Sequence, residues 1–294
     1  MNSMVSVKQL EKSYRNNRVI NQISFDVMQG EIFALLGING AGKTTILECI
    51  EGVRKYDSGT IEVNGKTGVQ LQTSSLMPEC KVKEAIQLLQ RWNKSRDSTD
   101  FSALGLNTIQ DKMYKTLSIG QKKRLHLALS LIGNPDIIIL DEPTAGLDVE
   151  GRLQLHDEIR QLKKAGKTIV LASHDMAEVE ELCDRIAILR DGQIAFIGTA
   201  SQLKNNKKNN PHHYQLENAV AIKVKASVDL SESEFTACQF SGIEQEYLVF
   251  TAPDAVAALS EILAYAKENG IEIVDIQTKQ ASLEQRFIEL SKEA

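Results

Sequence analysis

Residues 37–44 (Gly-Ile-Asn-Gly-Ala-Gly-Lys-Thr) form the segment of this sequence best suited to chemistry. They match the pattern GxxxxGK[ST] and lie between an apolar run and a stretch compatible with a helix. The glycines let the backbone curl so that its N–H groups point at phosphate oxygens, and a helix starting here adds the positive end of its dipole. Lys43 can neutralise outer phosphates and Thr44 can offer a hydroxyl to Mg²⁺. The segment therefore predicts a site for nucleotide phosphates.

Two adjacent carboxylates follow a second apolar run, in the segment Ile-Ile-Ile-Leu-Asp-Glu at 137–142. An acid at the carboxyl end of a parallel strand lies at the ligand-binding edge of the sheet. Asp141 suits Mg²⁺ or its water shell, and Glu142 can orient an attacking water. The same pattern can also end an ordinary core strand. With Lys43 about a hundred residues upstream, it favours phosphoryl chemistry.

The segment Leu-Ser-Ile-Gly-Gln at 117–121 resembles the signature of the ABC ATPases (LSGGQ), with Ile119 in place of the usual first glycine. The family's other motifs follow in order over about residues 4–198. The resemblance implies nucleotide binding by Tyr14, which would stack on adenine, and by Gly37, Ile38, Asn39, Gly40, Ala41, Gly42, Lys43, Thr44 and Thr45. It implies Mg²⁺ binding by Thr44, Gln72 and Asp141, catalysis by Glu142 and His174, a D-loop with Asp148, and contacts from Ser118, Gly120 and Gln121 to the ATP of an opposite protomer.

Alternatives remain for three of these residues. Tyr14 could be a packed surface aromatic instead of a stacking platform, and His174 could be a plain core histidine. Gln70 competes with Gln72 for the Q-loop role, which the spacing seen in the family assigns to Gln72.

The resemblance implies an ATPase that binds ATP and Mg²⁺ and forms a homodimer, since one chain carries one phosphate loop and one signature. A separate transmembrane permease is the implied partner, which places the protein on the cytoplasmic face of the membrane. The near-terminal segment Ser-Leu-Glu-Gln-Arg-Phe-Ile-Glu-Leu resembles the ending of the drug, bacitracin and lantibiotic exporter branch. The alternative is an ABC ATPase that acts on ribosomes or DNA, but those relatives carry two cassettes or long coiled coils.

The composition is consistent with an ATPase that has no nucleic-acid partner and no membrane span of its own. The 294 residues carry a net charge of −5, which disfavours broad nucleic-acid binding. The four cysteines are scattered, as expected for free thiols in a reducing compartment. The sequence has neither a secretory signal nor a run of about 18 apolar residues, so we expect no membrane span.

The elements that must hold these residues follow an α/β pattern with a mostly parallel sheet, here a P-loop NTPase core with an antiparallel β subdomain. Runs at 32–36, 137–140 and 168–172 predict buried strands. Asn64-Gly65 and Asp191-Gly192 predict type I′ hairpin turns. Asp148 should cap a helix that ends at Gly166, and a further helix should follow the signature from about residue 121.

We expect an ATPase domain at 1–204 with a helical insert at about 76–130, a polar linker at 205–215, and a small α+β domain at 216–294. In that last domain, alternation around residues 220–224 predicts a strand. Val256, Leu259, Leu263 and Ala266 predict the apolar face of a helix that Gly270 ends. Ser282 should cap a final helix.

Overall fold

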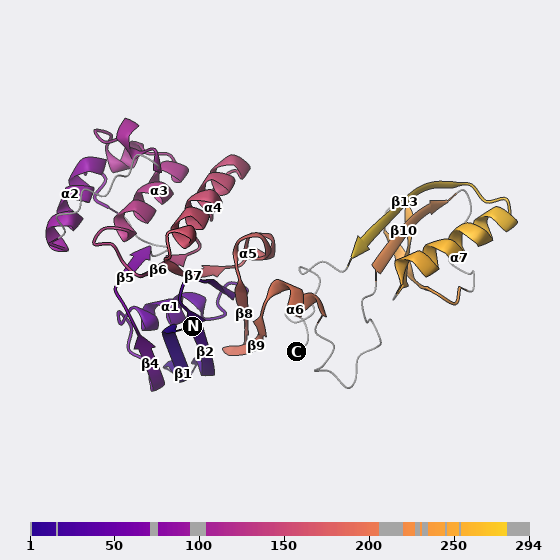
Figure 1. Cartoon of the computed structure of the whole chain (residues 1–294), viewed down its shortest axis with the longest axis horizontal. Coiled ribbons are helices and arrows are strands. Elements are labelled where there is room, and N and C mark those ends of the chain that lie inside the picture. The colour runs from indigo at the N-terminus through magenta and orange to yellow at the C-terminus, as the bar shows by residue number, and fades with distance from the viewer. Residues whose placement is uncertain are drawn as a thin grey trace. The chain divides into compact units, whose positions relative to one another are not determined.

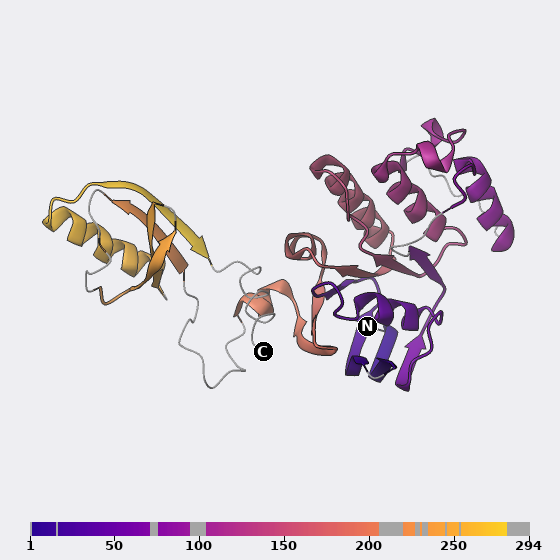
Figure 2. The ribbon, with the colours of Figure 1, turned by 180° about the vertical axis from the view of Figure 1, so that it is seen from behind.

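The computed structural model describes residues 2–15, 17–70, 76–94, 104–205, 220–226, 230, 235–244, 246–252 and 254–280. The chain divides into two compact units, Met1–Thr199 and Ala200–Ala294 (Figures 1 and 2). Of the expected linker only residue 205 is described, at the end of α6 (Ala200–Asn205). The helix expected after Ser282 lies outside the described residues, as does Gln72.

The first unit is built on a six-stranded sheet in the order β5-β6-β7-β3-β8-β9. The strands are β3 (Ile32–Leu36), β5 (Thr67–Gln70), β6 (Ile137–Asp141), β7 (Thr168–Ser173), β8 (Arg185–Arg190) and β9 (Gln193–Gly198). Only β9 runs antiparallel to its neighbour. Every residue of β3, β6 and β7 is buried, as continuous apolar runs predict for parallel strands covered on both faces. The three strands predicted from apolar runs are therefore confirmed.

A second, antiparallel sheet has the order β2-β1-β4, with β1 (Ser3–Tyr14), β2 (Asn17–Met28) and β4 (Ser58–Val63). The predicted hairpin at Asn64-Gly65 is wrong, because β4 pairs with β1 while β5 pairs with β6. Asp136 accepts a hydrogen bond from the Lys66 backbone N–H and draws the chain onto the other sheet. The hairpin at Asp191-Gly192 is confirmed: Arg190 pairs with Gln193, and both turn residues have positive φ, 48° and 74°.

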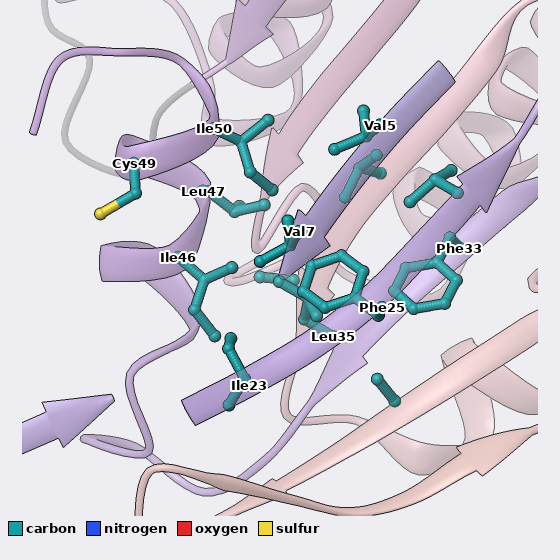
Figure 3. Packing of buried hydrophobic residues seen from close by; sticks show 14 of the residues in the cluster. Val5, Val7, Ile23, Phe25, Phe33, Leu35, Ile46, Leu47, Cys49 and Ile50 are labelled. Carbon is teal, nitrogen blue, oxygen red and sulfur yellow. The ribbon is translucent and has the colours of Figure 1, made fainter. Parts of the chain in front are cut away.

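The main hydrophobic core lies between the two sheets and encloses α1 (Lys43–Ile50). Side chains of β1, β2 and β3 meet the buried face of α1 in Figure 3, and Phe25 stacks on Phe33 with ring centroids 5.2 Å apart. Helices α3 (Ile119–Ser130) and α4 (Val149–Lys164) lie over the opposite face of the six-stranded sheet (Figure 1), and α5 (Met176–Leu182) follows β7. Helix α1 and its preceding loop are thus fixed from both sides.

Within 76–130, the described residues form α2 (Val82–Trp92), two short 3₁₀ helices, η2 (Leu106–Thr108) and η3 (Tyr114–Thr116), and α3. Helix α3 begins at Ile119, two residues earlier than expected, because Ser118 is its N-cap. Asp148 caps α4 as predicted, accepting from the Gly151 N–H at 2.8 Å. No helix in the described part of the chain is long and apolar enough to span a membrane.

The second unit has a sheet in the order β11-β12-β10-β13. Besides α6, its described elements are β10 (Val220–Ala226), β11 (Gln239–Glu244), β12 (Tyr247–Ala252), α7 (Ala255–Glu268) and β13 (Ile273–Gln280). The predicted strand and helix are present, but the predicted buried helix face is wrong in part. Ala258, Ile262 and Ala266 form the buried stripe, whereas Val256 and Leu263 are 74% and 47% exposed. Residues spaced four apart form the buried stripe, and Val256 and Leu263 fall outside it.

Candidate functional site

The loop between β3 and α1 has the glycine-dependent geometry expected of a phosphate loop. Gly40 and Gly42 have positive φ, 86° and 100°. A Cβ on Gly37 would approach the Leu189 carbonyl oxygen to 2.9 Å, so a side chain does not fit there. Gly42 caps α1 without any side-chain hydrogen bond, which leaves the first N–H groups of the helix for an anion.

The Lys43 side chain is buried and folds back over this loop. Its Nζ donates to the carbonyl oxygens of Gly37 at 2.7 Å and Ile38 at 3.1 Å. The same Nζ lies 4.0 Å from Oε1 of Glu142. Burial lowers the pKa of Lys43, and the carboxylates of Glu142 and Asp141 oppose that shift. The ammonium group therefore lies between the curled loop and the two acids at the end of β6.

Asp141 and Thr44 form the candidate magnesium site. Asp141 is buried, and its Oδ2 accepts a hydrogen bond of 2.8 Å from Thr44 Oγ1. Its other oxygen, Oδ1, is buried without a hydrogen-bond partner, and burial raises the pKa of this carboxyl group. An unsatisfied carboxylate oxygen beside a hydroxyl fits Mg²⁺, which takes one or two protein oxygens and completes its shell with phosphates and water. Among the described residues, no cluster of three or more His, Cys, Asp or Glu side chains offers another metal site.

Of the two glutamines, only Gln70 falls within the described part of the chain. It ends β5 opposite Leu140 and is buried, with its Oε1 lacking a hydrogen-bond partner. The assignment of the Q-loop role to Gln72 stays a prediction.

Glu142 and His174 come together from the ends of neighbouring strands, β6 and β7. His174 Nδ1 lies 3.1 Å from Glu142 Oε1, and the His174 side chain is 50% exposed. That exposure excludes the alternative of a plain core histidine. A carboxylate oriented by an imidazole, close to Lys43, is an arrangement that can activate water next to a phosphate.

Tyr14 ends β1 near the phosphate loop. Its ring is 38% exposed, and its hydroxyl oxygen is 3.5 Å from Thr45 Oγ1. Lys12 Nζ and the Arg54 guanidinium lie 5.6 and 5.2 Å from the ring centroid. The ring is thus close enough to the loop to contact a bound nucleotide, with two cations beside it.

The signature residues lie at the start of α3. Ser118 Oγ accepts from the Gln121 N–H, and Gln121 Oε1 accepts from the Ser118 N–H, at 3.2 and 3.1 Å. Ser118 is exposed, and within the described part of the chain no hydrogen bond or ion pair joins Ser118, Gly120 or Gln121 to residues 37–45. The Ile119 side chain is 56% exposed and lies near Gly146, where an added Cβ would meet it at 3.7 Å.

Behind Glu142 and His174 lies a buried polar cluster that no sequence motif predicted. Glu178 on α5 is 2% exposed and accepts from Thr144 Oγ1 at 2.7 Å and Ser173 Oγ at 2.5 Å. Its Oε1 also lies 3.5 Å from Nε2 of His156, which is fully buried on α4. The cluster therefore ties together the segments that carry Glu142 and His174. The one sequence signal for this cluster is Glu178 itself, four residues after His174. Asp175 caps the helix α5, and Glu178 lies in the first turn of that helix on its buried face.

Comparisons with known proteins agree with this geometry. A family model described as "ABC transporter" matches residues 20–145. An uncharacterized ABC transporter ATP-binding protein of Methanocaldococcus jannaschii is 38% identical over 67% of this chain and 78% of its own length. The linearmycin resistance ATP-binding protein of Bacillus subtilis is 28% identical over 98% of both chains. A solved ATP-binding subunit of an ABC transporter is 25% identical, with a TM-score of 0.63, over 69% of this chain and 93% of its own.

Proposed function

This protein belongs to the family of ABC transporter ATP-binding proteins and is an ATPase whose hydrolysis of ATP is coupled to transport, and we propose that it drives an exporter as a homodimer. The observation that carries the hydrolytic role is the 3.1 Å contact between Glu142 and His174. It sits beside Lys43 at the mouth of the phosphate loop, where a γ-phosphate and its attacking water would meet.

The chain's own residues divide the reaction as follows. The N–H groups of the loop and of the first turn of α1 bind the phosphate oxygens, and Lys43 Nζ offsets their charge. Glu142 accepts a hydrogen bond from the attacking water and draws its proton. His174 holds the Glu142 carboxylate in position. Tyr14 stacks on the adenine ring.

Thr44 and Asp141 would hold Mg²⁺, with Gln72 as a further candidate ligand. When bound, the ion neutralises developing charge on the β- and γ-phosphates. The unpartnered Asp141 Oδ1 supports this assignment.

A two-fold dimer explains why the signature and the phosphate loop are not joined within one chain. Ser118, Gly120 and Gln121 of one protomer would complete the phosphate site of its partner, with Asp148 in the D-loop near the same boundary. An isologous interface makes the two ATP sites identical. The exposed Ser118 hydroxyl at the N-terminus of α3 is suited to binding a phosphate across such an interface.

The partner is a transmembrane permease that holds the protein at the cytoplasmic face of the membrane. Three apolar side chains on the helical region are strongly exposed: Met77 (80%), Leu88 (63%) and Trp92 (82%). Leu88 and Trp92 are four residues apart on α2 and so share a face. Exposed apolar side chains grouped in this way mark an interaction surface.

The single tryptophan allows a direct test of this surface. A 5-fluorotryptophan label at Trp92 gives one ¹⁹F signal, which should shift when the protein is reconstituted with its permease in nanodiscs. Leu88→Glu should abolish the shift and lower transport while leaving ATP binding unchanged. Val256→Glu, an exposed apolar position in the second unit, is the matched control and should do neither. An unshifted signal in an active complex would place the permease elsewhere.

Export is favoured over import by the exporter-like near-terminal segment and by the full-length relative named for linearmycin resistance, since removing a compound from the cell confers resistance. The net charge of −5 gives no support to a nucleic-acid partner.

The decisive experiment for hydrolysis is Glu142→Gln. The substitution keeps the shape but removes the basic carboxylate, so turnover should fall roughly 10²-fold or more. ATP binding should survive, and a dimer with trapped ATP should accumulate on gel filtration. Near-normal hydrolysis by this variant would contradict the assignment of Glu142.

A further inference from the structure

Lys123 connects α3, the helix that begins at the signature and is called the signature helix below, to the proposed catalytic residue Glu142. It lies on α3, five residues after the N-cap Ser118, and its side chain is partly buried. Its Nζ donates a 2.7 Å hydrogen bond to the main-chain carbonyl oxygen of Glu142. No motif in the sequence analysis included this lysine.

The backbone that Lys123 contacts is in an unfavourable conformation. Glu142 has φ of +47°, in the left-handed region where a non-glycine residue pays a free-energy cost. Such a conformation persists when its surroundings fix it from several directions. The Glu142 N–H donates to the Ala172 carbonyl at 3.0 Å, and its own carbonyl accepts from Ala145 N–H at 3.3 Å and from Lys123. Lys123 makes the shorter of these two bonds to the carbonyl and is a charged donor.

The charges around Lys123 fit the same role. Burial lowers the pKa of its ammonium group, and the carboxylates of Glu142, Asp141 and Glu178 act against that shift. A partly buried cation among three acids is compensated in place, so removing it leaves those acids less balanced. The Lys123 side chain therefore interacts both with the backbone of Glu142, through a hydrogen bond, and with the negative charges at the end of β6.

We propose that Lys123 is a positioning residue that fixes the main chain of Glu142, and thereby the aim of its carboxylate, according to the position of the signature helix. The signature lies at the start of α3, and Lys123 lies on the same helix. A shift of α3 when the signature binds the partner's nucleotide would therefore move Lys123 and, through it, the backbone of Glu142 in the same chain. This inference rests on the proposed function of Glu142 and of the signature, and it gives the dimer a physical route between its two sites.

Steady-state kinetics of four full-length variants test the proposal. Lys123→Met keeps the length of the stem without the donor, and kcat should fall about tenfold or more with KM for ATP within about twofold, as for loss of one charged hydrogen bond. Lys123→Arg should recover most of kcat, and Lys123→Gln, a neutral donor, should lie between. Lys122→Met is the control at the next position, where Nζ lies over the Tyr114 ring, and should be close to wild type. Unchanged kcat in Lys123→Met, or an Arg variant as impaired as the Met variant, overturns the proposal.

A double-mutant cycle separates positioning from a general structural effect. If Lys123 acts through Glu142, adding Lys123→Met to Glu142→Gln should leave the residual turnover unchanged. A further loss of similar size would mean that Lys123 acts elsewhere and would overturn the inference. The proposed function fails on a different result, namely wild-type turnover in Glu142→Gln alone.

Discussion

Thr44 and Asp141 are 97 residues apart in sequence, yet Thr44 Oγ1 donates a 2.8 Å hydrogen bond to Asp141 Oδ2. The bond joins the first turn of α1 to the last residue of β6. Since β3 precedes the loop and β7 lies between β3 and β6 in the sheet, the two residues converge at the carboxyl edge of the strands. Open parallel sheets bind ligands at this edge, and here it gathers the phosphate loop, the two acids and His174.

Lys43 should determine nucleotide affinity. Its Nζ is held inside the loop by two carbonyl oxygens, so it is placed where outer phosphates would lie. Lys43→Ala should weaken ATP binding about tenfold or more in calorimetry, the loss expected for a charge-assisted contact. Lys55→Ala removes an exposed lysine from the segment after α1 and should bind as the wild type does. Equal affinities for the two variants would refute the phosphate-loop assignment.

Glu51 should make the stability of the first unit depend on pH. Both carboxylate oxygens are buried without a hydrogen-bond partner, and burial, then Glu48 and Asp141, raises the pKa of Glu51 to about 7 from 4.5. The native state thus binds a proton more tightly than the unfolded state, so the free energy of unfolding should decrease as pH rises from 4.5 to about 7.

Glu51→Gln tests this dependence, because glutamine keeps the shape without the charge. At pH values above 7 the variant should be more stable than the wild type, by at most about 3.5 kcal/mol, because the pKa rises from 4.5 to about 7 and each unit is worth about 1.4 kcal/mol. The gain should disappear as the pH approaches 4.5. Urea denaturation followed by circular dichroism measures it, with Glu62→Gln as an exposed control on β4. A difference that does not change with pH would show that the ionisation of Glu51 does not differ between the two states.

Much of the first unit could be predicted from sequence because its signals are local. The apolar runs at β3, β6 and β7 are buried on both faces, and Asp148 caps α4. The spacing of residues 37–44 determines the loop almost by itself. The Asp191-Gly192 turn was also predictable, since both of its residues tolerate positive φ.

The rest depends on contacts between distant segments. Asn64-Gly65 has hairpin composition, but strand pairing with β1 and β6 overrides it. Glu178 looks like a surface acid until Thr144 and Ser173 are seen to donate to it. The left-handed backbone of Glu142, and the lysine that contacts it, follow no periodic pattern. The sequence therefore indicates the candidate reacting groups more clearly than the contacts that position them.

The second unit should be dispensable for nucleotide binding. It has a sheet and a core of its own, in which Ile222, Val224 and Phe250 pack with Ala258 and Ile262. None of the described residues of this core belongs to the proposed ATP site, and we propose a regulatory or dimer-supporting role for the unit. A fragment ending at residue 205 should then fold and bind ATP with the affinity of the full chain in calorimetry. Lys43→Ala in that fragment is the control and should lower the affinity there as it does in the full chain. An insoluble fragment, or one that fails to bind ATP, would mean that the C-terminal strands belong to the ATPase core.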